Sequence, residues 1–122
     1  MTVSQSMTLA IPRDLVINSN HRIHWTVKGR KTRELRNLAR WAARAQLKPV
    51  EGRVRVLCVY QWPDNRRRDA ENLAPTSKAC VDGIRDAKIL TDDDGRYVVG
   101  VDNRQGEKSP TGLLLTITLE TA

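Results

Sequence analysis

The chain has 122 residues, 39% of them hydrophobic and 29% charged, a composition that predicts one folded domain and excludes a disordered chain. An excess of 21 Lys and Arg over 14 Asp and Glu gives a net charge of +7. This charge favours nucleic acid as the partner over the alternative of a basic protein that is merely soluble. No apolar run reaches the roughly 20 residues that cross a bilayer, and the polar N-terminus has no leader pattern, so we expect a cytoplasmic protein without membrane contact.

The first predicted strand runs from Met7 to Ile11 and ends at Pro12, which cannot donate to a strand ladder. Residues 12–31 are expected to form a loop that is rich in Arg, Lys, His and Asn side chains. Loops of this length without secondary structure are more often functional than idle. The loop is therefore a candidate for contacts with an anionic partner.

A helix is predicted to begin at Thr32, which can cap it, and to end before Pro49. The side chains expected to face the core are Leu35, Leu38, Trp41, Ala42 and Ala45. The other face carries four arginines at intervals of three and four: Arg33, Arg36, Arg40 and Arg44. Such a row is either an ordinary solvated face or a set of phosphate contacts, and the repulsion between like charges favours the second interpretation.

The next predicted elements are a strand from Arg53 to Trp62 and a helix from Ala74 to Ile84. Two further strands are predicted, from Tyr97 to Val101 and from Leu113 to Leu119. On the second helix we expect Leu73, Ser77, Cys80 and Ile84 to face inward. The order β-α-β-α-β-β predicts a single α+β domain over residues 1–122, with both helices packed on a small mixed sheet.

The two cysteines, Cys58 and Cys80, lie in the predicted second strand and second helix. We expect two buried thiols in preference to a disulfide. With His21 and His24 they lack the close spacing that is typical of zinc ligands, so a zinc site is not expected.

Acidic residues cluster twice, first at Asp69 and Glu71 and then at residues 92–94. If residues 69–71 are extended, Asp69 and Glu71 point to the same side, and a carboxylate of the second cluster can join them. Mg²⁺ prefers such oxygen ligands together with substrate phosphate. Lys78 can either approach the same phosphate or pair with Asp82 at i+4.

The stretch RRRDAENL, followed by SKACVDGI and ILTDDDGRYV, resembles the RusA family of Holliday-junction resolvases. The family motif is an Arg-rich lead, Asp-x-Asp-Asn, a helical Lys, a helical Asp and a late Asp-Asp pair. Upstream, MTLAIP and an Asn-rich basic loop before a helix are also similar to the family, so the resemblance covers nearly the whole chain. Two features depart from the pattern: Glu71 stands where Asp is usual, and residues 74–76 are inserted before Lys78.

The resemblance implies a homodimeric, magnesium-dependent endonuclease of the phage or prophage type that resolves four-way DNA junctions by paired nicks. It places Asp69, Glu71 and Asp93 at the metal-binding catalytic positions, with Lys78 as the essential lysine and Asp92 as a further metal ligand. Mn²⁺ is expected to substitute for Mg²⁺. The side chains expected to bind DNA are Arg22, Lys28, Arg30, Arg33, Arg36, Arg40, Arg44, Arg66, Arg67 and Arg68.

Two other functions are compatible with the sequence. One is a metal-dependent nuclease for flaps, forks or other branched DNA that uses the same carboxylates. The other is a non-catalytic nucleic-acid-binding protein, which explains the positive charge but gives the two acidic clusters no role. Carboxylates repel phosphate unless a cation lies between them, so this second alternative is the weaker one.

Overall fold

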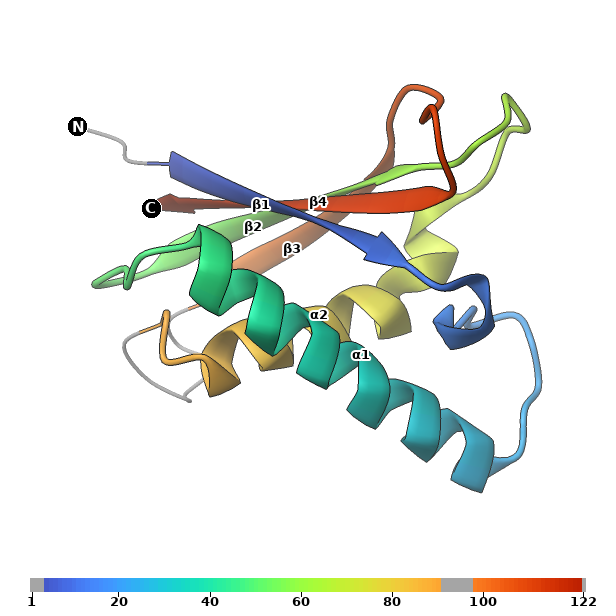
Figure 1. The fold of residues 1–122 in the computed structure, drawn as a ribbon, viewed down its shortest axis with the longest axis horizontal. Coiled ribbons are helices and arrows are strands. Elements are labelled where there is room, and N and C mark those ends of the chain that lie inside the picture. The colour runs from blue at the N-terminus through green and yellow to red at the C-terminus, as the bar shows by residue number, and fades with distance from the viewer. Residues whose placement is uncertain (1–3, 91–97, 122) are drawn as a thin grey trace.

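Two helices cover one face of a four-stranded sheet in the structure, a computed structural model that describes residues 4–90 and 98–121 (Figure 1). The elements are β1 (Ser4–Ile11), α1 (Trp25–Gln46), β2 (Val54–Gln61), α2 (Ala74–Asp86), β3 (Val98–Gln105) and β4 (Leu113–Thr121). Two short 3-10 helices, η1 (Arg13–Leu15) and η2 (Ala70–Leu73), follow β1 and precede α2. The predicted α+β class and the order β-α-β-α-β-β are confirmed.

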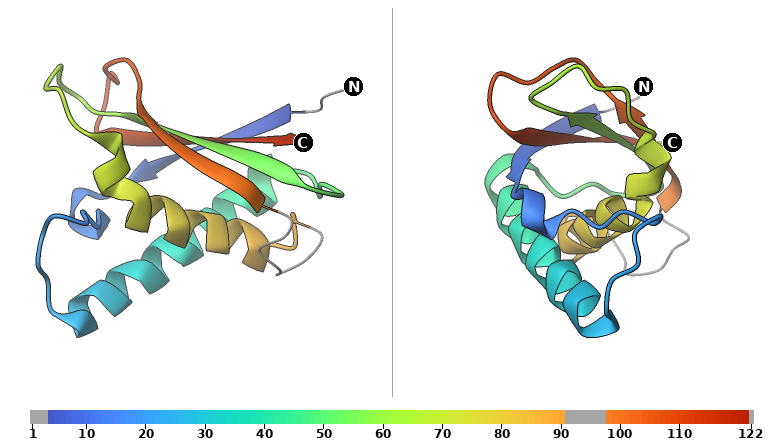
Figure 2. Two further views of the ribbon diagram at one scale, coloured as in Figure 1. Left: turned by 180° about the vertical axis from the view of Figure 1, so that it is seen from behind. Right: turned by 90° about the vertical axis from the view of Figure 1, so that its right-hand side faces the viewer.

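The strand order in the sheet is β1-β4-β2-β3. β4 pairs antiparallel with both β1 and β2, whereas β2 pairs parallel with β3. Parallel neighbours need a crossover connection, and α2 provides it on the helix-covered side of the sheet (Figure 2). The segment that carries Asp69 and Glu71 therefore lies inside this crossover, between the end of β2 and the start of α2.

The core lies between the sheet and the helices. Alternate residues of β2 and β4 are buried: Val54, Val56, Cys58, Tyr60, Leu113, Leu115, Ile117 and Leu119. On the opposite face of the sheet, hydroxyl pairs join β1 to β4, with Ser6 Oγ 2.7 Å from Thr118 Oγ1 and Thr8 Oγ1 2.9 Å from Thr116 Oγ1. Apolar and polar side chains thus alternate as expected for a sheet covered on one face.

α1 begins at Trp25, seven residues before the predicted start at Thr32. The predicted loop is thus shorter than residues 12–31. His24 caps the helix, because its Nδ1 accepts the backbone N–H of Thr26 at 3.2 Å. Histidine is not among the preferred capping residues, and residues 21–30 are all exposed, so neither a capping signal nor an apolar period marks this start.

The predicted buried face of α1 is wrong in part. Leu38 and Trp41 are 37% and 62% exposed, Ala45 is exposed, and the buried residues are Leu35, Ala39 and Ala43. Small side chains face α2 because the helices approach closely at Gly83. A Cβ atom added there would lie 2.3 Å from the carbonyl oxygen of Arg36. On α2, by contrast, the predicted inward residues Ser77, Cys80 and Ile84, with Leu73 before them, are all buried.

The outer edge of β1 is covered by the end of α1. Gln46 donates its Nε2 to the carbonyl of Thr8 at 2.9 Å, and its Oε1 accepts the N–H of Thr8 at 2.9 Å. Gln5 makes the same reciprocal pair with the backbone of Lys48, at 2.7 and 2.9 Å. The amide of Gln46 therefore occupies backbone groups of Thr8 that an edge strand would otherwise expose, and Gln5 ties β1 to the segment after α1.

Cys58 and Cys80 are buried free thiols, as predicted. Burial raises the pKa of Cys58 to about 11 and that of Cys80 to about 12. No helix within the described ranges is long and apolar enough to span a membrane.

Candidate functional site

Asp69 stands where the chain leaves the β2–η2 connection and turns into η2. Its backbone is extended, with φ −86° and ψ 107°, and its Oδ1 accepts the backbone N–H of Glu71 at 3.0 Å. A short carboxylate side chain at this position caps the turn in the way that aspartate usually does. Residues 69–71 are therefore not an extended segment, and the predicted strand-like alternation of Asp69 and Glu71 is wrong. Both side chains are nevertheless exposed.

Asp69 and Glu71 line two different hollows. Asp69 lies with Arg67, Arg68, Arg104, Gln105 and Asn103 in one of them. Glu71 lies in a groove whose lining includes Lys28, Lys78, Asp82, Arg85 and Asn103, here called the Glu71 groove. Asn103 of β3 belongs to both, so the two hollows adjoin at this residue. The structure thus places the two predicted carboxylates in neighbouring recesses.

A chain of hydrogen bonds that leads into the core fixes Asn103 at this junction. Its Oδ1 accepts the hydroxyl of Ser77 from α2, and Ser77 Oγ lies 2.6 Å from the hydroxyl of Tyr60 on β2. Tyr60 is fully buried, and burial raises the pKa of its phenol far above the ordinary range, so the phenol stays neutral. These contacts hold β2, α2 and β3 in register around the base of the Glu71 groove.

Lys78 lines the same groove as Glu71. It also makes the predicted alternative contact, with its Nζ 3.2 Å from Asp82 Oδ2. Arg85 approaches the other oxygen of Asp82 at 3.4 Å. The Lys78 side chain is 76% exposed, and exposed ion pairs contribute only about 0.2–1 kcal/mol, so Lys78 can leave Asp82 for a phosphate at little cost.

The remaining predicted metal ligands, Asp92 and Asp93, lie outside the described residues. Within residues 4–90 and 98–121, no three His, Cys, Asp or Glu side chains gather closely enough to hold a metal ion. Asp69 and Glu71 offer oxygen ligands on an exposed surface, which is the donor chemistry that Mg²⁺ takes when it keeps several waters. The donor set of these two residues fits magnesium.

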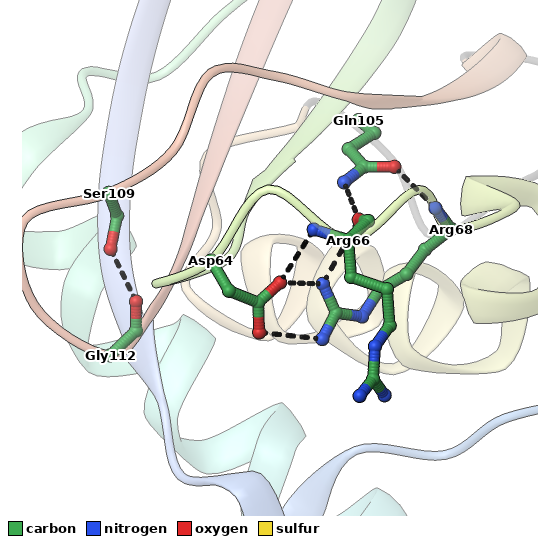
Figure 3. Close-up of polar contacts among 6 residues, drawn as sticks. All are labelled: Asp64, Arg66, Arg68, Gln105, Ser109 and Gly112. Atoms are coloured by element: carbon green, nitrogen blue, oxygen red, sulfur yellow. Dashed lines mark hydrogen bonds and ion pairs between the residues drawn. The ribbon is translucent and has the colours of Figure 1, made fainter.

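Arg68, one of the predicted DNA contacts, is held within the protein (Figure 3). Its Nη1 and Nη2 donate to Asp64 Oδ1 and Oδ2 at 2.7 and 3.1 Å, and its guanidinium carbon lies 4.0 Å from the Trp62 ring centroid. Its backbone N–H donates to Gln105 Oε1 at 2.7 Å. The guanidinium of Arg68 holds the pKa of the Asp64 carboxyl well below its usual range. The guanidinium of Arg68 is therefore already engaged within the protein, where it stabilises the structure of the site.

The arginines of α1 do not form a uniform free row. Arg36 is paired with Asp86 of α2. Arg40 and Arg44 lie against the exposed Trp41 ring, 5.2 and 5.7 Å from its centroid. Arg33 lines a shallow hollow with Trp25 and Lys28, and Arg30 pairs with Glu34 at 3.1 Å. Thus Arg36 joins the two helices, Arg40 and Arg44 stack on Trp41, and Arg33 lies at the surface.

A further hollow, which Asp69 also lines, was not predicted. We call it the basic hollow; besides Asp64, Arg68 and Asp69, its polar lining residues are Arg13, Asn18, His21, Lys31, Arg66 and Asn72. They come from the loop after β1, from α1 and from the connection that leads into η2. The abundance of nitrogen donors in residues 12–31 was the available signal, but only the fold shows which of them converge on Asp69.

Comparison with known proteins shows similarity to an uncharacterized protein. No known protein-family model matches the chain. It is 35% identical over 100 residues to an uncharacterized protein from Xylella fastidiosa (strain Temecula1 / ATCC 700964), in an alignment that covers 77% of this chain and 63% of that protein. The chain therefore spans less than two thirds of the length of this relative.

Proposed function

We propose that the protein is a magnesium-dependent endonuclease that resolves four-way DNA junctions. The observation that carries the proposal is the placement of Asp69 and Glu71 in adjoining hollows, next to Lys78 and within a surface of basic side chains. The resemblance of residues 66–98 to the RusA family supports the same assignment. A net charge of +7 supports a nucleic-acid substrate.

In this proposal Asp69, Glu71 and Asp93 hold Mg²⁺, with Asp92 as a further ligand. The metal, when bound, supplies activated water and Lewis-acid stabilisation of the scissile phosphate. The protein side chains have separate tasks. The Asp69 side chain is oriented by the N–H of Glu71, and Lys78 turns from Asp82 towards the phosphate to offset the charge that grows on its oxygens.

Two nicks in opposite strands are needed to resolve a four-way junction, and one chain offers one carboxylate site. A two-fold symmetric homodimer matches the symmetry of the junction. The resemblance to the RusA family implies the same assembly, and Trp25 and Trp41, which are 77% and 62% exposed, are candidates for the contact between the two chains. We include the homodimer in the proposal on this basis.

The test is a cleavage assay on labelled four-way junction, fork, flap and linear duplex, each with Mg²⁺, with Mn²⁺ and with EDTA. We expect paired symmetric nicks in the junction with either metal and no cleavage in EDTA. Preferred cleavage of forks or flaps would instead identify a nuclease for other branched DNA. Binding of all four substrates without cleavage in any metal would identify a non-catalytic nucleic-acid-binding protein.

A further inference from the structure

The basic hollow carries positive charge that the described protein does not neutralise. Within residues 4–90 and 98–121, Arg13, Lys31 and Arg66 make no ion pair. Asp64 also lines the hollow, but Arg68 occupies both of its oxygens. In Figure 3 the Arg66 guanidinium extends away from that pair, and no dashed line reaches it. Three cations therefore face one remaining carboxylate, that of Asp69.

The loop that supplies part of this hollow is fastened to the domain at two points. Thr76 of α2 accepts the N–H of Ile17 at its Oγ1 and donates the same hydroxyl to the carbonyl of Ile17, both at 2.9 Å. The N–H of Ser19 donates to the carbonyl of Asn72 at 2.8 Å. Ile17 and Thr76 are buried. The hollow is thus formed in advance, which lowers the entropic cost of ligand binding.

Arg68 stabilises the connection between β2 and η2, which also lines the basic hollow. Stacked on Trp62 and bound to Asp64, it fixes the connection from which Arg66 projects. Gln105 of β3 adds to this by donating its Nε2 to the carbonyl of Arg66 at 2.8 Å. Arg68 is therefore a positioning residue, and Arg66 is the side chain left available for a ligand.

Like charges that outnumber their counter-charges repel one another, and an anion between them relieves the repulsion. Asn18 and Asn72 line the same hollow, and their side-chain amide nitrogens donate no hydrogen bond within the described residues. Cationic groups together with amide donors are the usual set that contacts nucleic-acid phosphates without reading bases. The hollow also borders Asp69, next to the site of proposed cleavage.

We propose that the basic hollow binds a backbone phosphodiester of the DNA strand next to the cleavage site, with Arg13, Lys31 and Arg66 as its cations. The inference rests on the proposed function, because the strand is the substrate of that nuclease. Binding here holds the strand across Asp69, so the neighbouring phosphate enters the carboxylate site. Arg13 and Lys31 are thereby added to the DNA-binding residues.

The test measures binding of a labelled four-way junction in EDTA, by fluorescence anisotropy over a range of salt concentrations. The variants are Arg13→Gln, Lys31→Gln and Arg66→Gln. The control, Lys48→Gln, removes the same charge beyond the far end of α1, since fifteen residues, or about 22 Å of helix, separate Lys31 from Gln46. We expect each variant to bind about tenfold more weakly, and its slope of log K against log salt to flatten by about 0.9. The control should bind like wild type, and Arg66→Lys should recover most of the affinity.

Three variants that bind like Lys48→Gln, with an unchanged salt slope, would overturn the inference while leaving the proposed function intact. Weakened binding in all three, combined with failure of the wild type to cleave in Mg²⁺ or Mn²⁺, would retain the phosphate site and overturn the proposed function. A final arm titrates inorganic phosphate at constant ionic strength against ¹⁵N-labelled protein. Saturation of the hollow by inorganic phosphate at the concentrations that suffice for junction DNA would identify a free-phosphate site and overturn strand binding.

Discussion

Arg36 and Asp86 join the two helices by a bidentate ion pair, with Nε 2.5 Å from Oδ2 and Nη2 2.9 Å from Oδ1. Hydrogen bonding to Arg36 lowers the pKa of Asp86 below its ordinary value of 3.8. The stabilising contribution of Asp86 is therefore fully present above this value and is lost as the pH falls through the lowered pKa.

We expect Asp86→Asn to lower the free energy of unfolding by about 0.5–1 kcal/mol at pH 7 and by progressively less below pH ~4. Urea unfolding of both proteins across this pH range measures the difference. The matched control is Glu34→Gln, which breaks the pair with Arg30 within α1 and leaves the contact between the helices intact. A loss that is independent of pH would show that the ion pair is not its source.

Gly83 of α2 packs directly against Arg36, Ala39 and Arg40 of α1. We expect Gly83→Ala to destabilise the fold by about 1–3 kcal/mol, because the added Cβ would overlap the Arg36 carbonyl and the Ala39 side chain. Gly29→Ala in α1 is the control. A Cβ there meets nothing within 4 Å, so this change should stabilise the helix by about 0.5–1 kcal/mol. Thermal unfolding of the two variants should therefore shift in opposite directions.

Buried thiols should react with a disulfide reagent only when the protein opens. With a pKa of about 11 for Cys58, roughly one molecule in a thousand carries its thiolate at pH 8, and burial blocks access to it. We expect no thiol titre in the native protein and two thiols per chain in 6 M guanidinium. A fast native reaction would contradict the packing of β2 against α2.

At the carboxylate site we expect Glu71→Asp to retain cleavage and Glu71→Gln to abolish it, because aspartate keeps the charged oxygen ligand and glutamine does not. Asp69→Asn should also abolish cleavage while junction binding stays equal or becomes tighter, since a negative charge facing DNA is removed. Nicking and gel-shift assays on the same preparations separate the two effects. Cleavage by Glu71→Gln at the wild-type rate would remove Glu71 from the site.

The proposed homodimer predicts a particle of about twice the 13.8 kDa chain mass in light scattering at micromolar concentration. On a cruciform plasmid, paired nicks should give linear product within one binding event. A strictly monomeric protein that yields only nicked circles would contradict junction resolution and favour single cuts in other branched DNA.

The strand and helix order followed from local signals, because Pro12, Pro49 and Pro63 end segments and apolar alternation marks the strands. The face of α1 could not be found in this way. Periodicity assigns the largest apolar side chains to the core, yet Trp41 is exposed and Ala39 is buried, since contact with Gly83 requires small residues. The requirement for small side chains arises from the contact between the two helices, so neither segment alone reveals it.

The candidate site was accessible from sequence in its residue types but not in its geometry. Asp69 and Glu71 were identified because acidic residues cluster there in a basic chain, and Lys78 because it follows them on the predicted second helix. The turn at residues 69–71 depends on the bond from Asp69 to the N–H of Glu71, which competes locally with extended backbone. The contribution of Asn103 depends on parallel pairing of β2 with β3, a long-range contact that no local pattern reports.

Gln46 hinders the addition of a further strand at the β1 edge of the sheet. At Thr8, both backbone groups on the outer side of β1 are already engaged by its side-chain amide, so a second chain could extend the sheet there only by displacing two hydrogen bonds. The end of α1 thus protects this border against intermolecular strand addition, the first step of many aggregation reactions. If the protein binds DNA as proposed, chains that crowd on one strand would come together without joining their sheets at β1.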